Sequence, residues 1–268
     1  MQMTRFIIKS LFYTLLIAFM NTSLSNAQGK GIKIKVLTYN IHHCNPPSKP
    51  DVIDIPAIAK VIRSSAADLV ALQEVDVHTE RSGKSINEAE ELAKAAGMHY
   101  YFVKTIDYEG GAYGIAVLSK FRIVDSASYQ LPMKASINGE PRGLAVITVQ
   151  LKKGKQLKFA CTHLDLKKEN AYLQAVKIKE LFAQEEIPSI LCGDFNSLPE
   201  SEALAQLLQS FTNSDPAHAF TIPTINPNRT IDYLLYRQPD QIKVSTHQVI
   251  NETYASDHLP VMATFKVQ

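Results

Sequence analysis

Polar side chains that can do chemistry stand at the ends of several apolar runs in this sequence. They are Asn40, Glu74, His163, Asp194, Asn196, Asp232, Asp257 and His258. Any one of them alone is most simply a turn or capping residue, a role that Asp and Asn favour. A whole set at successive strand ends on one side of a sheet is difficult to explain in that way, because buried carboxylates and amides cost free energy without polar partners. The set therefore predicts a polar site.

The residue types in this set indicate phosphoryl chemistry. The members that can bind a metal are carboxylates and amides, and no Cys or His pair has the spacing of a zinc site. Hard oxygen ligands select Mg²⁺, with Mn²⁺ as a substitute, over Zn²⁺. Such a cation neutralises charge on a phosphate and stabilises the leaving oxygen. A histidine held by a carboxylate supplies a general acid or base, and His163 and His258 are available for that role.

The elements that position these residues are apolar strands interleaved with amphipathic helices. We expect strands over 33–41, 68–74, 100–104, 114–119, 122–129, 143–151, 156–162, 189–192, 231–236, 242–249 and 261–267. Helices are predicted around 55–62, from a capping box of Ser85 and Glu88 to Gly97, over 169–184, and after a cap formed by Ser197 with Glu200. Many strands with few helices predict two packed sheets with helices outside them.

Composition and charge describe an ordinary globular chain rather than a strongly basic nucleic-acid binder. The chain has 268 residues, of which 46% are hydrophobic and 20% are charged. No repeat or linker divides residues 28–268, so we expect one domain there. Two of the 28 Lys and Arg residues, Arg5 and Lys9, precede residue 28, which leaves 26 basic residues against 26 acidic ones. This balance provides no extended basic face for a duplex, and the sequence has no basic stripe interleaved with aromatic residues.

The first 27 residues have the pattern of a secretory signal peptide. A short basic start over 1–9 precedes the apolar run 11–20, which is too short to span a bilayer as a helix. Ser25 and Ala27 place small residues where signal peptidase cleaves. We expect cleavage after Ala27 and export to the periplasm or the cell exterior, without stable membrane insertion. A retained membrane anchor is the alternative.

The three cysteines do not form a disulfide framework. Cys161 and Cys192 lie inside apolar runs, and Cys44 lies in a predicted loop. We interpret all three as small buried hydrophobic residues rather than metal ligands or nucleophiles. One bridge among them stays open as an alternative in an oxidising compartment.

Six short motifs, taken in their order along the chain, resemble those of a known family. TYN (38–40), LQE (72–74), THL (162–164), GDFN (193–196), IDYLLY (231–236) and SDHLP (256–260) resemble the signature blocks of the endonuclease/exonuclease/phosphatase superfamily. That group contains deoxyribonucleases, abasic-site endonucleases, inositol-polyphosphate phosphatases, neutral sphingomyelinases and deadenylases. The resemblance implies an α/β fold, a four-layer α/β/β/α sandwich in which two mixed, mainly antiparallel sheets pack face to face.

The resemblance also implies a metal site and a water-activating group. Glu74 resembles the principal Mg²⁺ ligand, with Asn40 beside it and Asp257 contributing at the metal. Asp194 resembles the carboxylate that orients or deprotonates the attacking water, and Asn196 resembles a contact to the phosphate. The implied reaction is in-line attack of water on a phosphoester.

Two histidines complete the implied site. His258 resembles the catalytic histidine beside the scissile phosphate, and Asp232 resembles the carboxylate that fixes its tautomer and raises its basicity. His163 resembles the second histidine of the deoxyribonucleases, which contacts a phosphate oxygen. The sequence offers no clear counterpart of the glutamate that pairs with this second histidine in those enzymes.

Three further residues are candidates for substrate binding. Arg81 lies in a loop after Glu74, where it can bind a phosphate or remain a solvated loop charge. Tyr113 belongs to the glycine-rich stretch 110–114, which lets the backbone approach a substrate or simply forms a turn. Arg142 precedes a strand and is another candidate for a phosphate contact.

The sequence as a whole predicts an exported Mg²⁺-dependent phosphoesterase, a monomer that hydrolyses a phosphodiester or a phosphomonoester. By analogy, the loop 75–85 followed by the stretch 110–114 favours a small or lipid-linked phosphoester. A secreted endonuclease or exonuclease acting on DNA or RNA is the alternative. A catalytically silent binding module would have gaps at the metal and histidine positions, and this sequence has none. A zinc or serine hydrolase would need a HExxH or GxSxG motif, and neither is present.

Overall fold

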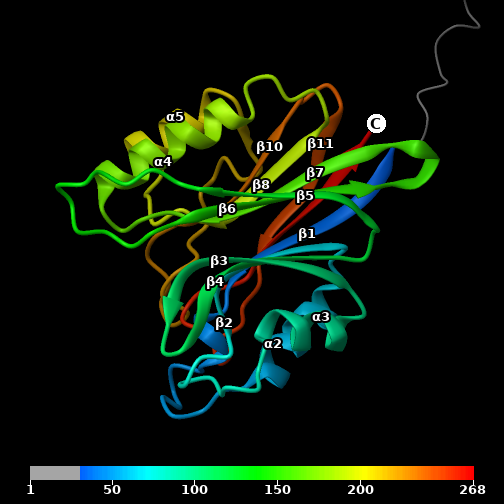
Figure 1. Cartoon of the computed structure of the whole chain (residues 1–268). Helices are drawn as coiled ribbons and strands as arrows, with labels where there is room; N and C mark the ends of the chain where they lie inside the picture. Colours follow the sequence, from blue (N-terminus) through cyan, green and yellow to red (C-terminus); the bar gives the residue numbers. More distant parts are fainter. Residues whose placement is uncertain (1–30) are drawn as a thin grey trace, which may run out of the picture. The chain divides into compact units, whose positions relative to one another are not determined.

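Two sheets of six strands each form the framework of the fold (Figure 1). The computed structural model describes residues 31–268, and the predicted signal peptide over 1–27 lies outside the described residues. The first sheet has the strand order β11-β12-β1-β2-β4-β3, and the second has the order β5-β6-β7-β8-β10-β9. The strands are β1 (Ile32–Asn40), β2 (Leu69–Val77), β3 (His99–Tyr108), β4 (Gly111–Ser119), β5 (Ile123–Gln130), β6 (Gly143–Gln150), β7 (Gln156–His163), β8 (Ser189–Asp194), β9 (Thr212–Asn213), β10 (Asp232–Arg237), β11 (Ile242–Val249) and β12 (Val261–Val267).

The strand pairing in both sheets is mixed and mainly antiparallel. β1 runs parallel to β2, and β7 runs parallel to β8. The pairs β2–β4, β3–β4 and β11–β12 of the first sheet are antiparallel, as are β5–β6, β6–β7, β8–β10 and β9–β10 of the second. In each sheet the parallel pair places two carboxyl ends side by side, and Asn40, His163 and Asp194 end such strands.

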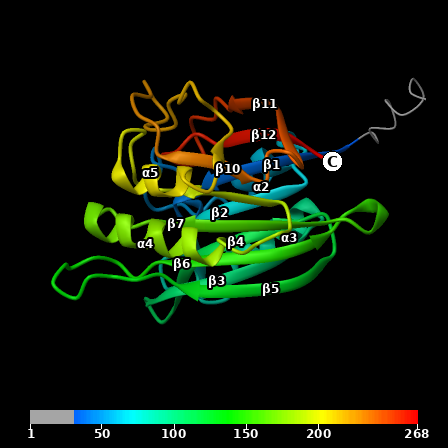
Figure 2. The ribbon, with the colours of Figure 1, turned by 90° about the horizontal axis from the view of Figure 1, so that it is seen from above.

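Helices cover the outer face of each sheet, which gives the four layers that the family resemblance implied (Figures 1 and 2). They are α2 (Ile55–Ser65), α3 (Glu88–Ala96), α4 (Lys168–Leu181) and α5 (Glu202–Leu208), with the short 3-10 helices η1 (His42–Cys44) and η2 (Lys152–Gly154). The first core lies under α2 and α3, where Leu92 packs with Leu72. The second lies under α4 and α5, where Leu204 packs with Leu191. None of the helices within residues 31–268 has the length and apolar character needed to cross a membrane.

The N-terminus of α3 differs from the predicted capping box. Asn87 is the N-cap, and its side-chain oxygen accepts a hydrogen bond from the backbone N–H of Glu90 at 3.1 Å. The predicted box of Ser85 and Glu88 is wrong because the Glu88 carboxylate bonds elsewhere. It accepts the backbone N–H of Asp76 at 2.8 Å, so it ties the helix to β2 instead of closing the helix end.

The N-terminus of α5 is also displaced from its predicted position. Ser201 is the N-cap, and its hydroxyl accepts the backbone N–H of Leu204 at 3.2 Å. The predicted cap of Ser197 with Glu200 is therefore wrong by one turn. Both serines stand in a polar stretch of similar composition, and the path of the chain out of β8 decides which of them reaches a helical amide.

All three cysteines are free and buried, as expected from the apolar runs around them. Cys161 faces the layer between the two sheets, where its sulfur accepts a hydrogen bond from the side-chain amide of Gln73 at 3.2 Å. The disulfide alternative is therefore not realised among the described residues.

Candidate active site

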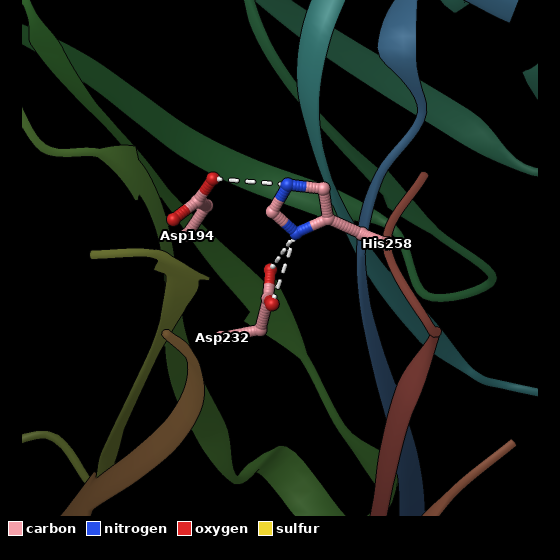
Figure 3. Close-up of side chains that lie close together, drawn as sticks. All are labelled: Asp194, Asp232 and His258. Carbon is pink, nitrogen blue, oxygen red and sulfur yellow. Dashed lines mark hydrogen bonds and ion pairs between the residues drawn. The ribbon is translucent and has the colours of Figure 1, made fainter. Parts of the chain in front are cut away.

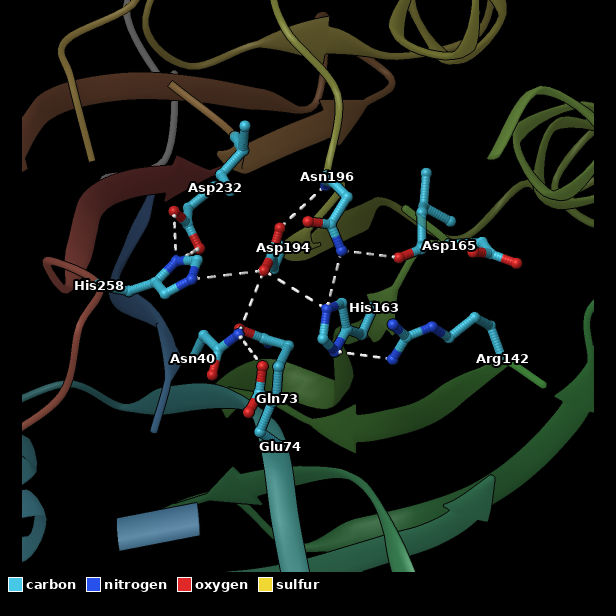
Figure 4. Close-up of polar contacts among 12 residues, drawn as sticks. Asn40, Gln73, Glu74, Arg142, His163, Asp165, Asp194, Asn196, Asp232 and His258 are labelled. Carbon is cyan, nitrogen blue, oxygen red and sulfur yellow. Dashed lines mark hydrogen bonds and ion pairs between the residues drawn. The ribbon is translucent and has the colours of Figure 1, made fainter. Parts of the chain in front are cut away.

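Strand ends from both sheets meet at a cavity of about 570 Å³ (Figure 4). The first sheet contributes Asn40 at the end of β1 and Glu74 in β2. The second contributes His163 and Asp194 at the ends of β7 and β8, and Asp232 at the start of β10. The sequence analysis expected these residues on one side of a single sheet, and the structure corrects this. The two sheets face each other, and the site forms where their polar ends meet.

A break in the strand directs Glu74 toward this cavity. Glu74 has a φ of 57°, and the β2–β4 register shifts between Leu72 and Val75. Leu72 and Val75 both pack in the core under α2 and α3, although residues three apart in a regular strand face opposite sides. This bulge gives Glu74 a conformation that non-glycine residues rarely adopt. Its carboxylate reaches the cavity instead of the core.

Asn40 joins the carboxylates of the two sheets. Its side-chain nitrogen donates to Glu74 Oε1 at 3.0 Å and to Asp194 Oδ2 at 3.1 Å. Its side-chain oxygen accepts the backbone N–H of His42 at 3.1 Å. Carboxylates only accept and a backbone N–H only donates, so all three contacts fix the same amide orientation. In this arrangement the fully buried Asn40 holds the two carboxylates together and offers its oxygen to the backbone.

The turn after β8 depends on two special backbone conformations. At Gly193 an added Cβ would lie 1.9 Å from the carbonyl oxygen of Thr162, so only glycine allows β7 and β8 to approach there. Asn196 has a φ of 45°, which asparagine tolerates better than most residues, and its N–H donates to Asp194 Oδ1 at 2.8 Å. The GDFN motif therefore fixes the position of the Asp194 carboxylate.

His258 lies between two carboxylates (Figure 3). Its Nδ1 is 3.1 Å and 3.0 Å from the two oxygens of Asp232, and its Nε2 is 3.7 Å from Asp194 Oδ2. Thr221 donates its hydroxyl to Asp232 Oδ2 at 2.6 Å and so orients that carboxylate. Burial lowers the pKa of His258, but the charges of Asp232 and Asp194 outweigh it and raise the pKa to about 10. The two carboxylates therefore favour the protonated form of His258.

Among the carboxylates of the site, Asp194 is the most deeply buried. Burial raises its pKa to about 7, against the opposing effects of the His258 cation and of the hydrogen bonds from Asn196 and Asn40. A carboxylate with a raised pKa is a stronger base than an ordinary aspartate. Asp194 can therefore accept a proton in the neutral pH range.

Hydrogen-bond donors face both ring nitrogens of His163. Arg142 Nη1 lies 3.1 Å from His163 Nδ1, and a guanidinium only donates. Nε2 lies 3.4 Å from Asp194 Oδ2 and 3.0 Å from the side-chain nitrogen of Asn196, which itself donates to the Leu164 carbonyl at 2.9 Å. Burial and nearby positive charges hold the pKa of His163 well below its usual range.

Arg142 supplies the partner of His163 that the sequence did not reveal. It is a buried residue of the cavity wall and forms an ion pair of 2.7 Å with Glu140. Its Nε has no hydrogen-bond partner among the described residues. The deoxyribonuclease pattern would place an acid beside the second histidine, whereas here a permanent cation keeps His163 neutral.

The other predicted residues divide between the cavity and its surroundings. Tyr113 lines the cavity, as Arg142 does. Asp257 follows Ser256, whose hydroxyl donates to the Asn40 carbonyl at 2.7 Å, so the SDHLP motif is tied to the end of β1. Arg81 instead pairs with the buried Asp76, Nε to Oδ2 at 2.7 Å, and does not belong to the cavity wall. The structure thus places Arg81 in an internal ion pair.

One group of three side chains within residues 31–268 brings possible metal-ligand atoms within 4.8 Å of one another: Asp194, Asp232 and His258. A protonated histidine has no lone pair for a metal, and His258 already bonds Asp232 through Nδ1. This group therefore suits proton handling better than ion binding. Glu74 fits a hard cation better, because its carboxylate lines the cavity and Asn40 bonds only its Oε1.

Several cavity residues escaped the sequence analysis. They are Glu140, Leu166, Lys168, Leu198, Ile222 and Ile231. Thr221, which orients Asp232, was also missed. Ile231 opens the IDYLLY motif, and the others lie outside the six motifs. Their only signal is proximity in the chain: Leu166 follows THL, and Leu198 follows GDFN.

Comparisons with known proteins agree with this geometry. The profile described as "Endonuclease/Exonuclease/phosphatase family" matches residues 37–258. YbhP of Escherichia coli K12 is 25% identical over 252 residues, which cover 88% of this chain and 97% of YbhP. An endonuclease/exonuclease/phosphatase structure from Beutenbergia cavernae superposes with a TM-score of 0.73 at 23% identity, covering 88% of this chain and 72% of that one. A mannosyl-6-phosphatase from Bacteroides thetaiotaomicron gives 0.70 at 20% identity, covering 87% and 99%.

Proposed function

Because the chain belongs to the endonuclease/exonuclease/phosphatase family, we propose that it is an exported, Mg²⁺-dependent enzyme acting on a small or lipid-linked phosphoester. Family membership makes it a hydrolase of phosphoester bonds. The observation that carries the proposal is the His258 cation held between Asp232 and Asp194 at the wall of the cavity that Glu74 and His163 also line. A buried cation beside a carboxylate of raised pKa suits attack of water on a phosphate.

The proposed mechanism gives each residue of the site one task. Asp194 orients the attacking water and accepts its proton, because burial makes this carboxylate more basic. His258 stabilises the charge that develops on the phosphate, and Asp232 keeps its ring oriented. His163, which Arg142 holds at Nδ1, contacts a phosphate oxygen from the cavity wall. A divalent cation held by Glu74 would neutralise charge on the phosphate and stabilise the leaving oxygen.

The charges of the cavity support a small substrate over a nucleic-acid strand. Glu74, Glu140 and Asp194 line the same cavity as Arg142 and Arg229, so the wall carries no uniform positive charge. Residues 28–268 as a whole are electrically balanced. A strand of nucleic acid needs a continuous basic track for its neighbouring phosphates. A single phosphate needs only local donors, which His163, His258 and Arg142 supply.

The test compares substrate classes under matched controls. The purified protein with Mg²⁺ is incubated with supercoiled plasmid and, separately, with sugar phosphates, inositol phosphates and short-chain phospholipids. We expect phosphate release from small or lipid-linked esters and an intact plasmid, with activity lost in His258→Ala and in the presence of a chelator. Plasmid nicking that disappears in both controls would instead identify a nuclease, and hydrolysis that survives the chelator would contradict the metal requirement.

A further inference from the structure

A second cavity, of about 840 Å³, opens beside the catalytic one. The two cavities share Lys168, Asn196 and Leu198 as lining residues, so they adjoin each other. The wall of the second cavity comes from the start of α4, from the turn between β8 and α5, and from Lys134 in the loop between β5 and β6. Its size falls in the range of small-molecule binding sites. Any group esterified to a phosphate in the catalytic cavity can extend into it.

The charges of this second cavity disfavour a polyanion. Its wall carries the carboxylates of Glu169, Glu200 and Glu202 against the ammonium groups of Lys134 and Lys168. A second phosphate would therefore meet an excess of negative charge, which costs free energy at short range. Neither a nucleic-acid strand nor an inositol polyphosphate matches this lining.

The wall of the second cavity combines a larger apolar surface with polar groups that a plain hydrocarbon chain cannot hydrogen-bond. Carboxylate, amide and hydroxyl groups, the last from Ser197 and Ser201, alternate with the apolar surfaces of Tyr172, Leu173 and Leu198. A hydrocarbon would desolvate the polar groups without replacing their hydrogen bonds. Leu198 is 41% exposed and lies where the two cavities join, so it presents an apolar surface to any ligand that crosses from one to the other.

From these properties we infer that the second cavity binds the neutral, hydroxyl-bearing ring of a sugar phosphate whose phosphate occupies the catalytic cavity. A sugar ring has an apolar face of C–H groups that can pack on Tyr172. Its hydroxyls both donate and accept, so they match the mixture of carboxylates, amide and serine hydroxyls around that ring. The inference rests on the proposed function, because it names the substrate class of the same site.

The test measures binding separately from turnover. Titration calorimetry in the His258→Ala background, with Mg²⁺, compares glucose 6-phosphate, ethyl phosphate and octyl phosphate. We expect glucose 6-phosphate to bind about 10-fold more tightly than ethyl phosphate, since an added ring contact and hydrogen bonds supply that factor. Tyr172→Ala should reduce the advantage to within about 2-fold. Tyr172→Phe, which keeps the aromatic face, should retain most of it.

The controls separate this inference from the proposed function. Tyr100→Ala removes a partly exposed tyrosine of β3 in the other sheet and should leave all three affinities unchanged. Equal affinity for glucose 6-phosphate and ethyl phosphate, or tighter binding of octyl phosphate than of glucose 6-phosphate, would overturn the sugar site while the phosphoesterase proposal stands. If none of the three phosphates binds, the proposed function fails and the sugar site fails with it.

Discussion

Two clusters of buried charged groups occupy the described part of the chain, and they differ in what they can do. The histidine cluster consists of Asp194, Asp232 and His258. The arginine cluster consists of Asp76, Arg81 and Glu88, with Thr79 and Ser82, and ties the 78–87 loop to β2 and α3. Both bury a carboxylate beside a cation. Only the histidine cluster faces the catalytic cavity.

The difference lies in the cation and in how fully its partners are bonded. Arg81 is a permanent cation that stacks over Tyr108, 4.4 Å from the ring centroid, and binds both oxygens of Asp76, at 2.7 Å and 2.9 Å. The hydroxyls of Thr79 and Ser82 complete the coordination of Asp76. His258, in contrast, is a titratable group held between two carboxylates at the wall of the catalytic cavity. Burial of charge alone therefore does not identify a catalytic group, whereas a titratable group at a cavity does.

The largest expected effect follows from removing the histidine of the catalytic cluster. His258→Ala should lower turnover by at least ~10², because only the stabilisation of the transition state is lost. The fold should stay intact. His247→Ala is the matched control, since His247 pairs with Asp215 away from the catalytic cavity and should keep normal turnover. A near-normal rate in His258→Ala would remove the assigned role.

Removing Arg81, the cation of the arginine cluster, should lower stability and leave turnover nearly unchanged, which is the opposite of the result expected for His258→Ala. Arg81→Ala leaves the fully buried Asp76 without its bidentate partner and should lower the free energy of unfolding by about 2 kcal/mol. Turnover should stay within about 3-fold of the wild type, because Arg81 does not line the cavity. Denaturant unfolding and initial rates measure both quantities. Lys84→Ala, which breaks an exposed pair with Glu80, is the control. A large rate loss with unchanged stability would return Arg81 to the substrate-binding residues.

A smaller effect is expected from the proposed metal ligand. Glu74→Gln keeps an oxygen for the Asn40 amide but removes the charge that attracts a divalent cation. The Mg²⁺ concentration for half-maximal activity should rise by about 10-fold, with a smaller change in rate at saturating Mg²⁺. Glu140→Gln, a second glutamate of the same cavity, is the control for a general loss of negative charge. An identical metal titration for Glu74→Gln and the wild type would exclude Glu74 as a ligand.

The sequence predicted many of the elements well, because they depend on local patterns. The expected strands over 242–249 and 261–267 coincide with β11 and β12, and the alternation of apolar residues is enough to define them. Gly97 ends α3 in the predicted left-handed conformation. The family assignment was confirmed by the match over residues 37–258.

The features that the sequence did not reveal depend on contacts between distant elements. The bulge that turns Glu74 into the cavity requires a register shift against β4, which no local pattern encodes. Arg142 precedes β6 and His163 ends β7, so their pairing follows only from the fold. The loop sequence likewise allows Arg81 either to bind a substrate or to pair with an internal carboxylate. Only the fold shows that it pairs with Asp76.

The smallest expected effect concerns Glu88 of the arginine cluster and is measured as the pH dependence of stability. Burial, with the charge of Asp76 adding to it, raises the pKa of Glu88 to about 8, whereas an unfolded glutamate titrates near its ordinary value of about 4.3. Between these two values the folded state holds a proton that the unfolded state has released, so this group makes stability fall as pH rises. The titratable groups that face Glu88 are Cys44, Asp76 and Arg81. All three are still present in the Glu88→Gln variant, in which the side chain at position 88 cannot ionise. The variant should match the wild type at pH 5 and exceed its free energy of unfolding by about 1 kcal/mol at pH 6. Thermal unfolding at both pH values measures this difference, and Glu90→Gln, at an exposed glutamate, is the control. If the free energy of unfolding depends on pH in the same way for Glu88→Gln and the wild type, Glu88 is ionised in the folded protein.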